Sequence, residues 1–158
     1  MVSINMEGYM SNIKIKPSWE LYYSGKYETL YDCSKEEPGL SFARWIGFFN
    51  IDDSVFIDEM KISSINFIKD KKIVAMISDH SDTTTAAPKT VDWITENWYE
   101  NVYKYGLRFE AIIPPLTAVG KLSVNRIEKQ GQTKRIEVVI CIDYETTYSQ
   151  CVSYLKKI

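Results

Sequence analysis

One apolar run constrains the fold of this chain more than any other feature. Residues 73–77 (IVAMI) hold five consecutive apolar side chains, which suits a strand covered on both faces, as in the middle of a parallel sheet. A polar loop over 78–87 follows, and then Pro88 opens a stretch with apolar residues at helical spacing that ends at Gly106. We therefore predict a central strand followed by a helix, the repeating unit of an α/β sheet.

The same alternation continues toward the C-terminus. Residues 109–113 and 136–142 are predicted strands, and a short helix over 116–127 lies between them. Asp143 can cap a last helix, because its side chain can accept a hydrogen bond from the free backbone N–H groups of the first turn. Strands separated by helices imply parallel pairing through right-handed crossovers.

The N-terminal half has a different pattern. Residues 19–23 and 27–31 are rich in aromatic side chains and flank a short turn with Gly25, which predicts a β-hairpin. A third strand over 40–46 follows, and Asn50 can cap a helix that runs to about residue 70. The prediction is an α/β fold with a mixed sheet: antiparallel hairpin strands, then a parallel β-α-β part, packed with about four helices.

Length and composition fit one globular domain. The chain has 158 residues, of which 45% are hydrophobic and 25% are charged, so it can bury a core and is too apolar for disorder. Residues 1–17 show no clear periodicity and end at Pro17. We predict that they form an N-terminal extension and that residues 18–158 form a single domain.

Charge and cysteine content narrow the function classes. A net charge of -2 provides no field that attracts nucleic acid. No apolar run approaches the roughly 18 residues of a membrane span, and no signal peptide is visible. The three cysteines, Cys33, Cys141 and Cys151, lack CxxC spacing, which argues against a disulfide framework and a zinc site. We expect a cytoplasmic protein without a metal or another cofactor.

Several segments carry a resemblance to a known family. The segments are 42–48 (FARWIGF), 75–80 (AMISDH), 88–98 (PKTVDWITENW), 120–124 (GKLSV) and 143–145 (DYE). From about residue 40 to the end, the chain resembles anti-sigma-factor antagonist (STAS) domains. It is more closely similar to the STAS/SEC14-like small proteins of Bacteroidetes-type bacteria. This resemblance implies a SpoIIAA-like α/β fold.

The resemblance also implies where regulation would occur. In regulatory STAS domains a strand runs into an Asp-Ser-Ser-Gly turn at a helix start, and phosphorylation of a serine there switches partner binding. Here the equivalent strand end reads Ser78-Asp79-His80-Ser81, the loop is longer, and no glycine follows. Ala87 stands where related chains often place a capping serine. The sequence therefore departs from the pattern of the phosphorylation switch.

The loop after the central strand is the first candidate site. Its polar side chains are Asp79, His80, Ser81, Thr83, Thr84 and Thr85. Loops at the carboxyl ends of parallel strands bind ligands in α/β proteins, and hydroxyls near a helix start could carry a phosphate. The alternative, which we favour, is a solvated loop whose side chains bond to the local backbone.

A catalytic or metal-binding role for this loop has weak support. His80 beside Asp79 or Asp82 could act as a general base, but adjacent residues of an extended segment point apart. A metal would need more ligands, such as Asp143 and Glu145, to converge on it. We therefore expect an ordinary surface histidine and a protein that is not an enzyme.

The aromatic residues are the last candidate. Trp98 and Tyr105 lie on the apolar stripe of the predicted helix and are expected in the core, whereas Trp93 and Tyr103 lie off it. Exposed aromatic residues suit interfaces and pockets. Our leading hypothesis is a non-enzymatic STAS-like module that binds a protein partner or forms a homodimer. The alternative is a carrier of a small apolar or lipid ligand in a cavity between helix and sheet.

Overall fold

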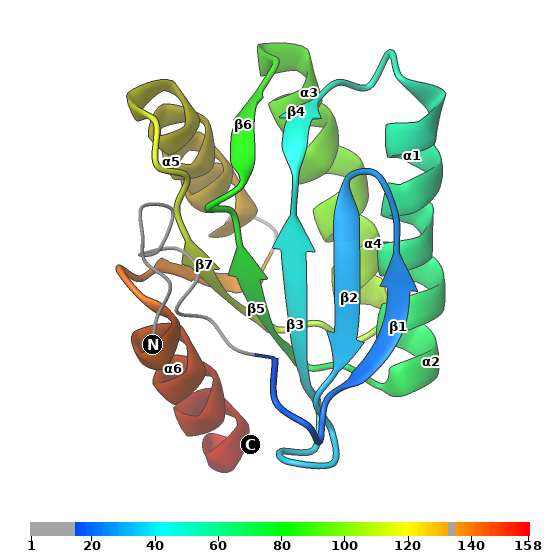
Figure 1. Ribbon diagram of the computed structural model, residues 1–158, viewed down its shortest axis with the longest axis vertical. Helices are drawn as coiled ribbons and strands as arrows, with labels where there is room; N and C mark the ends of the chain where they lie inside the picture. The colour runs from blue at the N-terminus through cyan, green and yellow to red at the C-terminus, as the bar shows by residue number, and fades with distance from the viewer. Residues whose placement is uncertain (1–14, 133–134) are drawn as a thin grey trace.

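The computed structural model describes residues 15–132 and 135–158. Its main sheet has six strands in the order β1-β2-β3-β5-β7-β8. Their bounds are Glu20–Ser24 (β1), Glu28–Asp32 (β2), Leu40–Trp45 (β3), Ala75–Asp79 (β5), Phe109–Ile113 (β7) and Glu137–Ile140 (β8). A second sheet pairs β4 (Gly47–Phe49) with β6 (Thr83–Ala86), which continue upward from β3 and β5 (Figure 1).

The sheet is mixed, as predicted. β1, β2 and β3 pair antiparallel, whereas β3, β5, β7 and β8 pair parallel. The apolar run at 73–77 supplies the start of β5, which lies between β3 and β7, and every residue of β5 is buried. The prediction of a central strand covered on both faces is confirmed.

Three helical segments connect strands, and a fourth follows the last strand. The first joins β4 to β5 and consists of α1 (Ser54–Lys61), the π-helical η2 (Ile62–Phe67) and α2 (Ile68–Lys71). The second joins β6 to β7 and consists of α3 (Pro88–Trp93), the π-helical η3 (Ile94–Trp98) and α4 (Tyr99–Lys104). The third is α5 (Ala118–Gln132), which is longer than predicted, and the fourth is α6 (Tyr144–Lys157).

The helices cover both faces of the main sheet. Helix α6 packs on one face, over a core that includes Phe42, Ile77 and Cys151. The other three helical segments pack on the opposite face, where Ala43 and Trp45 lie. Alternate residues of β3 therefore serve different cores, as expected for a strand. Figure 1 shows α6 in front of the sheet and α1 and α4 behind it.

The structure corrects one predicted cap and confirms the other. Asp53, not Asn50, caps α1, because its carboxylate accepts a hydrogen bond from the N–H of Val55 at 3.0 Å. Asn50 instead accepts from the N–H of Asp52 and closes the turn before the helix. Asp143 caps α6 as predicted, with the N–H of Thr146 at 2.8 Å.

The prediction that residues 78–87 form only a polar loop is wrong. Strand β5 extends to Asp79, and residues 83–86 form β6. Short, β-branched threonines suit a strand, and the buried hydroxyl of Thr83 is satisfied by the carbonyl oxygen of Trp45 at 2.9 Å. Strand β4 was also missed, since three residues are too few to show a periodicity.

Most of the predicted N-terminal extension, residues 1–14, lies outside the described residues. Within the described part of the chain, Lys16 forms an ion pair with Glu36 at 2.8 Å, and Trp19 stacks on Phe42. No helix in residues 15–132 or 135–158 is both long and apolar enough to cross a membrane.

Candidate functional site: an apolar groove beside β6 and a buried polar layer

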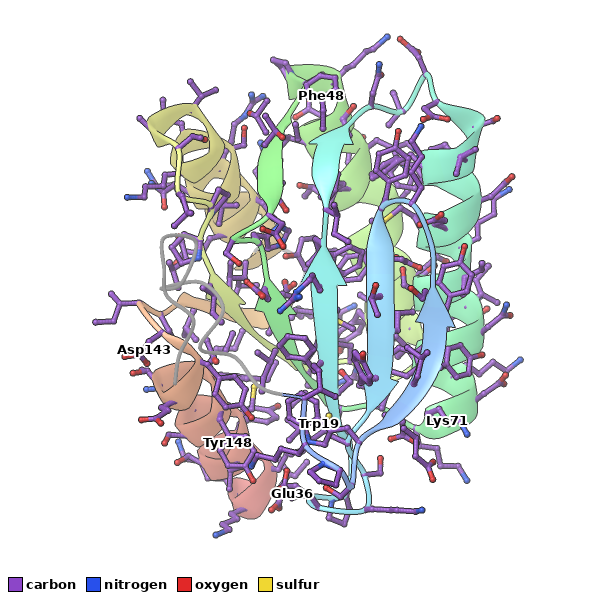
Figure 2. The ribbon with its side chains drawn as sticks, in the orientation of Figure 1. Trp19, Glu36, Phe48, Lys71, Asp143 and Tyr148 are labelled. Carbon is purple, nitrogen blue, oxygen red and sulfur yellow. The ribbon has the colours of Figure 1, made fainter. Side chains whose placement is uncertain are left out.

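An apolar groove lies where β4 and β6 meet α3 and α5, at the carboxyl ends of the parallel strands. Its volume is about 450 Å³. It is lined by Phe48, Thr85, Ala86, Ala87, Pro88, Val91, Val119, Leu122, Ser123 and Arg126. Phe48, Val119 and Leu122 are 45%, 62% and 68% exposed. Figure 2 shows Phe48 at the opposite end of the molecule from Glu36 and Lys71.

Close packing holds α5 against β6 and sets the wall of this groove. The Oγ1 of Thr117 donates to the carbonyl oxygen of Thr84 at 3.3 Å, and the hydroxyls of Thr85 and Ser123 lie 2.8 Å apart. Gly120 allows this approach, because a Cβ on it would stand 2.8 Å from the carbonyl oxygen of Thr84. The helix therefore packs on β6 through small and hydroxyl residues, and Val119 and Leu122 stay exposed to solvent.

Arg126 lines the groove, and two ion pairs lie on or next to the elements that border it. Arg126 pairs with Asp92 across α5 and α3 at 3.4 Å, and Lys89 pairs with Asp52 at 2.9 Å. All four side chains are well exposed, so each pair contributes little to stability. Apolar lining with a charged rim is the general anatomy of a protein-binding surface.

The predicted loop site is divided between two faces of the sheet. Asp79 lies on the face that α6 covers, where Arg44 approaches at 3.3 Å and the hydroxyl of Ser81 donates to its other oxygen at 2.7 Å. His80 lies on the opposite side, between the rings of Trp45 and Phe49. Asp79 and His80 therefore do not converge, and the geometry of a His–Asp base is absent here.

The three threonines of the loop have separate environments. Thr83 is buried and bonded to the carbonyl of Trp45, and Thr85 is half-buried and bonded to Ser123. Thr84 is the exposed hydroxyl among them. Of the three hydroxyls, that of Thr84 is therefore the most accessible to a kinase. The sequence alone predicts all three as equal candidates.

The prediction that His80 is an ordinary surface histidine is wrong. The side chain is buried, its ring stacks on Trp45 with centroids 6.0 Å apart, and its Nδ1 lies 3.0 Å from the Oγ1 of Thr83. Burial lowers the pKa of His80 to about 3, so the ring is neutral at neutral pH. The sequence could not reveal this, since its neighbours in the chain are polar while its aromatic neighbours come from other segments.

A small internal cavity lies next to His80. It is lined by Trp45, Phe49, Met60, His80, Ile94, Trp98, Tyr99, Glu110 and Ile127. Glu110 is buried and accepts hydrogen bonds from the hydroxyls of Tyr99 and Ser78. Burial raises the pKa of Glu110, although these two hydrogen bonds act against the shift. Sequence analysis missed Glu110, because one glutamate in an apolar strand carries no motif.

We call the buried polar residues Ser78, His80, Thr83, Glu110, Glu28 and Glu59 the buried polar layer. Within this layer, Glu28 and Glu59 form a pair of buried carboxyl groups. Glu59 accepts the backbone N–H groups of Lys26 and Tyr27 at 2.7 and 2.8 Å, which ties α1 to the β-hairpin turn. Glu28 is fully buried in β2, and burial, with the nearby Glu59 charge, raises the pKa of Glu28 well above its usual value. Sequence analysis did not single out this pair.

Both π-helical segments border the buried polar layer. Trp98 of η3 donates its indole N–H to the hydroxyl of Ser63 in η2 at 3.0 Å. Ser63 and Ser64 in turn donate to the carbonyl oxygen of Met60. π-helical turns are rare and are frequently found at functional sites. Here η3 places Trp98 against the internal cavity, and Met60, near the end of α1 just before η2, lies against it too.

The predicted aromatic interface residues are both half-buried. Trp93 packs against Phe56 of the core, with ring centroids 6.2 Å apart. Tyr103 lies between the guanidinium groups of Arg108 and Arg135, at 4.0 and 4.6 Å from its ring centroid. Neither lines the apolar groove, and their proposed role in an interface stays a prediction.

The described residues contain no cluster of metal ligands, and their three cysteines are buried. No group of three or more His, Cys, Asp or Glu in residues 15–132 and 135–158 could hold a metal ion. Cys33, Cys141 and Cys151 are free and buried in the core under α6, where burial raises the pKa of each thiol. High thiol pKa values are typical of inert, structural cysteines.

Comparison with known proteins found few similarities. No protein-family model matches the sequence, and no curated protein matches it. Among solved structures, the chain is similar to an uncharacterized protein of the DUF3478 family with a SpoIIAA-like fold from Shewanella loihica PV-4. The two share 11% sequence identity and a TM-score of 0.49, over 84% of this chain and 91% of that chain. The fold of this chain follows from its own strand order, described above.

Proposed function

We propose that this chain is a protein-binding module that uses the apolar groove to dock a partner protein or a second copy of itself. One observation carries the proposal: Phe48, Val119 and Leu122 come from two elements and expose their side chains around one groove. Exposed apolar side chains that gather in one place mark interaction sites, whereas scattered ones are ordinary.

Regulation through protein contacts is also the role that the STAS resemblance implies. The groove lies at the carboxyl ends of the parallel strands, where open α/β sheets bind their ligands. Thr84, the exposed threonine of β6, lies next to it, and its carbonyl oxygen contacts Gly120 and Thr117 of the α5 wall. A phosphate on Thr84 would add about two negative charges at this edge, which gives the proposed module a means of control.

A photo-crosslinker in the groove tests the proposal. Benzoylphenylalanine at Phe48 is a close replacement for the natural side chain, and Leu21, which is 58% exposed on β1, provides the matched control position. We expect a crosslinked adduct in the cells of origin from position 48 and not from position 21. An adduct of twice the chain mass identifies self-association, and another mass identifies a partner. Equal adducts at both positions would contradict the proposal.

A carrier of a small apolar ligand is the second candidate. The groove, at about 450 Å³, lies within the range of roughly 300–1,000 Å³ that small-molecule sites occupy. The internal cavity of about 20 Å³ is too small for an acyl chain, so such a ligand would sit in the groove. Native mass spectrometry of the protein from its own cells tests this: a carrier has an added mass of a few hundred daltons, and a bare chain mass removes this candidate.

A further inference from the structure

The internal cavity lies among buried side chains. Each of its nine lining residues is buried. The volume of about 20 Å³ exceeds the roughly 10–15 Å³ that the centre of one water molecule needs. A cavity of this size either stays dry, if its lining is apolar, or holds a polar guest if unpaired polar atoms face it.

Hydrogen bonding defines which nitrogen of His80 carries the proton. The hydroxyl of Thr83 has one hydrogen, which it donates to the carbonyl oxygen of Trp45 at 2.9 Å. The same oxygen lies 3.0 Å from Nδ1 of His80, so it accepts a hydrogen bond from Nδ1–H. In a neutral imidazole the other nitrogen is then an acceptor. No hydrogen bond to Nε2 of His80 is found within residues 15–132 and 135–158.

Trp45 supplies the complementary group. Its indole N–H is buried and has no hydrogen-bond partner in the described part of the chain. The ring lies nearly parallel to that of His80, with an interplanar angle of 16° and centroids 6.0 Å apart. The free nitrogen of the buried His80 side chain and the buried indole N–H of Trp45 therefore lie on neighbouring rings, and both residues line the cavity. Leaving the buried indole N–H unpaired would cost about 1–3 kcal/mol.

We propose that the cavity is a binding site for one small neutral hydrogen-bonding molecule, with water as its resident guest, held between Nε2 of His80 and the indole N–H of Trp45. The guest donates one hydrogen bond to the histidine and accepts one from the tryptophan. Glu110 also lines the cavity, and each of its two oxygens already accepts one hydrogen bond, from Tyr99 and from Ser78. Ions are excluded, because the lining residues are mostly apolar and the charge would be desolvated.

A crystal structure of the full chain, with and without pressurised xenon, tests this site. We expect one ordered density peak at hydrogen-bond distance from Nε2 of His80 and no xenon in the cavity. An empty cavity that takes up xenon would overturn the proposal, since xenon enters dry apolar cavities. Two-bond ¹H–¹⁵N NMR on the same protein provides a second reading: the proposal requires the Nδ1–H tautomer of His80, and the Nε2–H tautomer contradicts it.

Two matched tryptophan variants separate the guest site from general packing. Trp45→Phe removes the indole N–H that holds the guest, whereas Trp98→Phe removes one that already bonds to Ser63. Both tryptophans line the cavity. We expect the ordered peak to disappear or lose most of its occupancy in Trp45→Phe and to remain in Trp98→Phe. If Trp45→Phe does not fold, the xenon and NMR measurements on the natural chain still decide the question.

Discussion

Nδ1 of His80 lies 3.0 Å from the Oγ1 of Thr83, and the same oxygen donates to the backbone of Trp45. Replacement of Thr83 by Val keeps the shape of the side chain but leaves two buried polar groups without partners. We predict a loss of about 1–3 kcal/mol in the free energy of unfolding, measured by urea denaturation. Thr84→Val, at the exposed neighbouring position, should change it by less than about 0.5 kcal/mol. Equal losses in Thr83→Val and Thr84→Val would contradict the hydrogen-bonding role of Thr83.

Burial of His80 predicts a dependence of stability on acid. Its pKa falls from 6.5 to about 3 on folding, so the unfolded chain binds the proton that the folded protein excludes. The contribution of the neutral His80 to the free energy of unfolding is fully present above pH 6.5. It is lost at about 1.4 kcal/mol per pH unit as the pH falls toward 3. The free energy of unfolding of His80→Gln should therefore fall less steeply than that of the natural chain over this window. Parallel curves would show that His80 is accessible to protons.

Glu28 predicts the opposite pH dependence. Because its pKa is raised in the folded protein, its contribution to stability is complete below the usual glutamate pKa of 4.5 and is lost as the pH rises toward the folded value. Glu28→Gln removes this loss. We predict that the variant is more stable than the natural chain at pH 8 and gains less at pH 4.5.

The control for Glu28 is Glu96→Gln, on the exposed face of η3. Its effect should stay within about 0.5 kcal/mol at both pH values. Urea denaturation at the two pH values provides the comparison. A Glu28→Gln variant that is destabilised equally at both would show that the carboxylate is ionised and paired in the folded protein.

Gly120 predicts an effect that runs against helix propensity. Alanine at an exposed helical position stabilises by up to about 1 kcal/mol relative to glycine. A Cβ on Gly120, however, would stand 2.7 Å from the Cβ of Pro115 and 2.8 Å from the carbonyl oxygen of Thr84. Gly120→Ala should therefore loosen α5 from β6 and lower the free energy of unfolding by about 1–3 kcal/mol. The melting temperature should fall with it. Val119→Ala, one residue away and exposed, should leave the melting temperature nearly unchanged.

The main architecture could be predicted because its elements have clear periodicities. The apolar run at 73–77 and the stripe from Val91 to Val102 each depend on local sequence, and the structure places both as expected. The buried polar layer could not be predicted. His80 lies among polar neighbours in the chain, and its burial depends on Trp45 and Phe49, which the chain brings from more than thirty residues away.

The groove could be predicted only in part. Its position follows from the rule that ligands bind at the carboxyl ends of parallel strands. Its lining does not, because the apolar residues of α5 fit a core-facing stripe equally well. Only the packing of Gly120 and Ser123 on β6 turns Leu122 and Val119 outward. Helix orientation of this kind is a tertiary property.

The central claim, that the groove docks a protein, is tested most directly by the crosslink from position 48 in two further variants. Leu122→Glu places a charge in the groove, and Ile142→Glu places one at an apolar side chain that is 88% exposed and does not line the groove. Neither side chain is buried, so both variants should fold. We predict that the adduct is lost in Leu122→Glu and kept in Ile142→Glu. An adduct that survives in both, or disappears in both, would contradict the assignment of the groove.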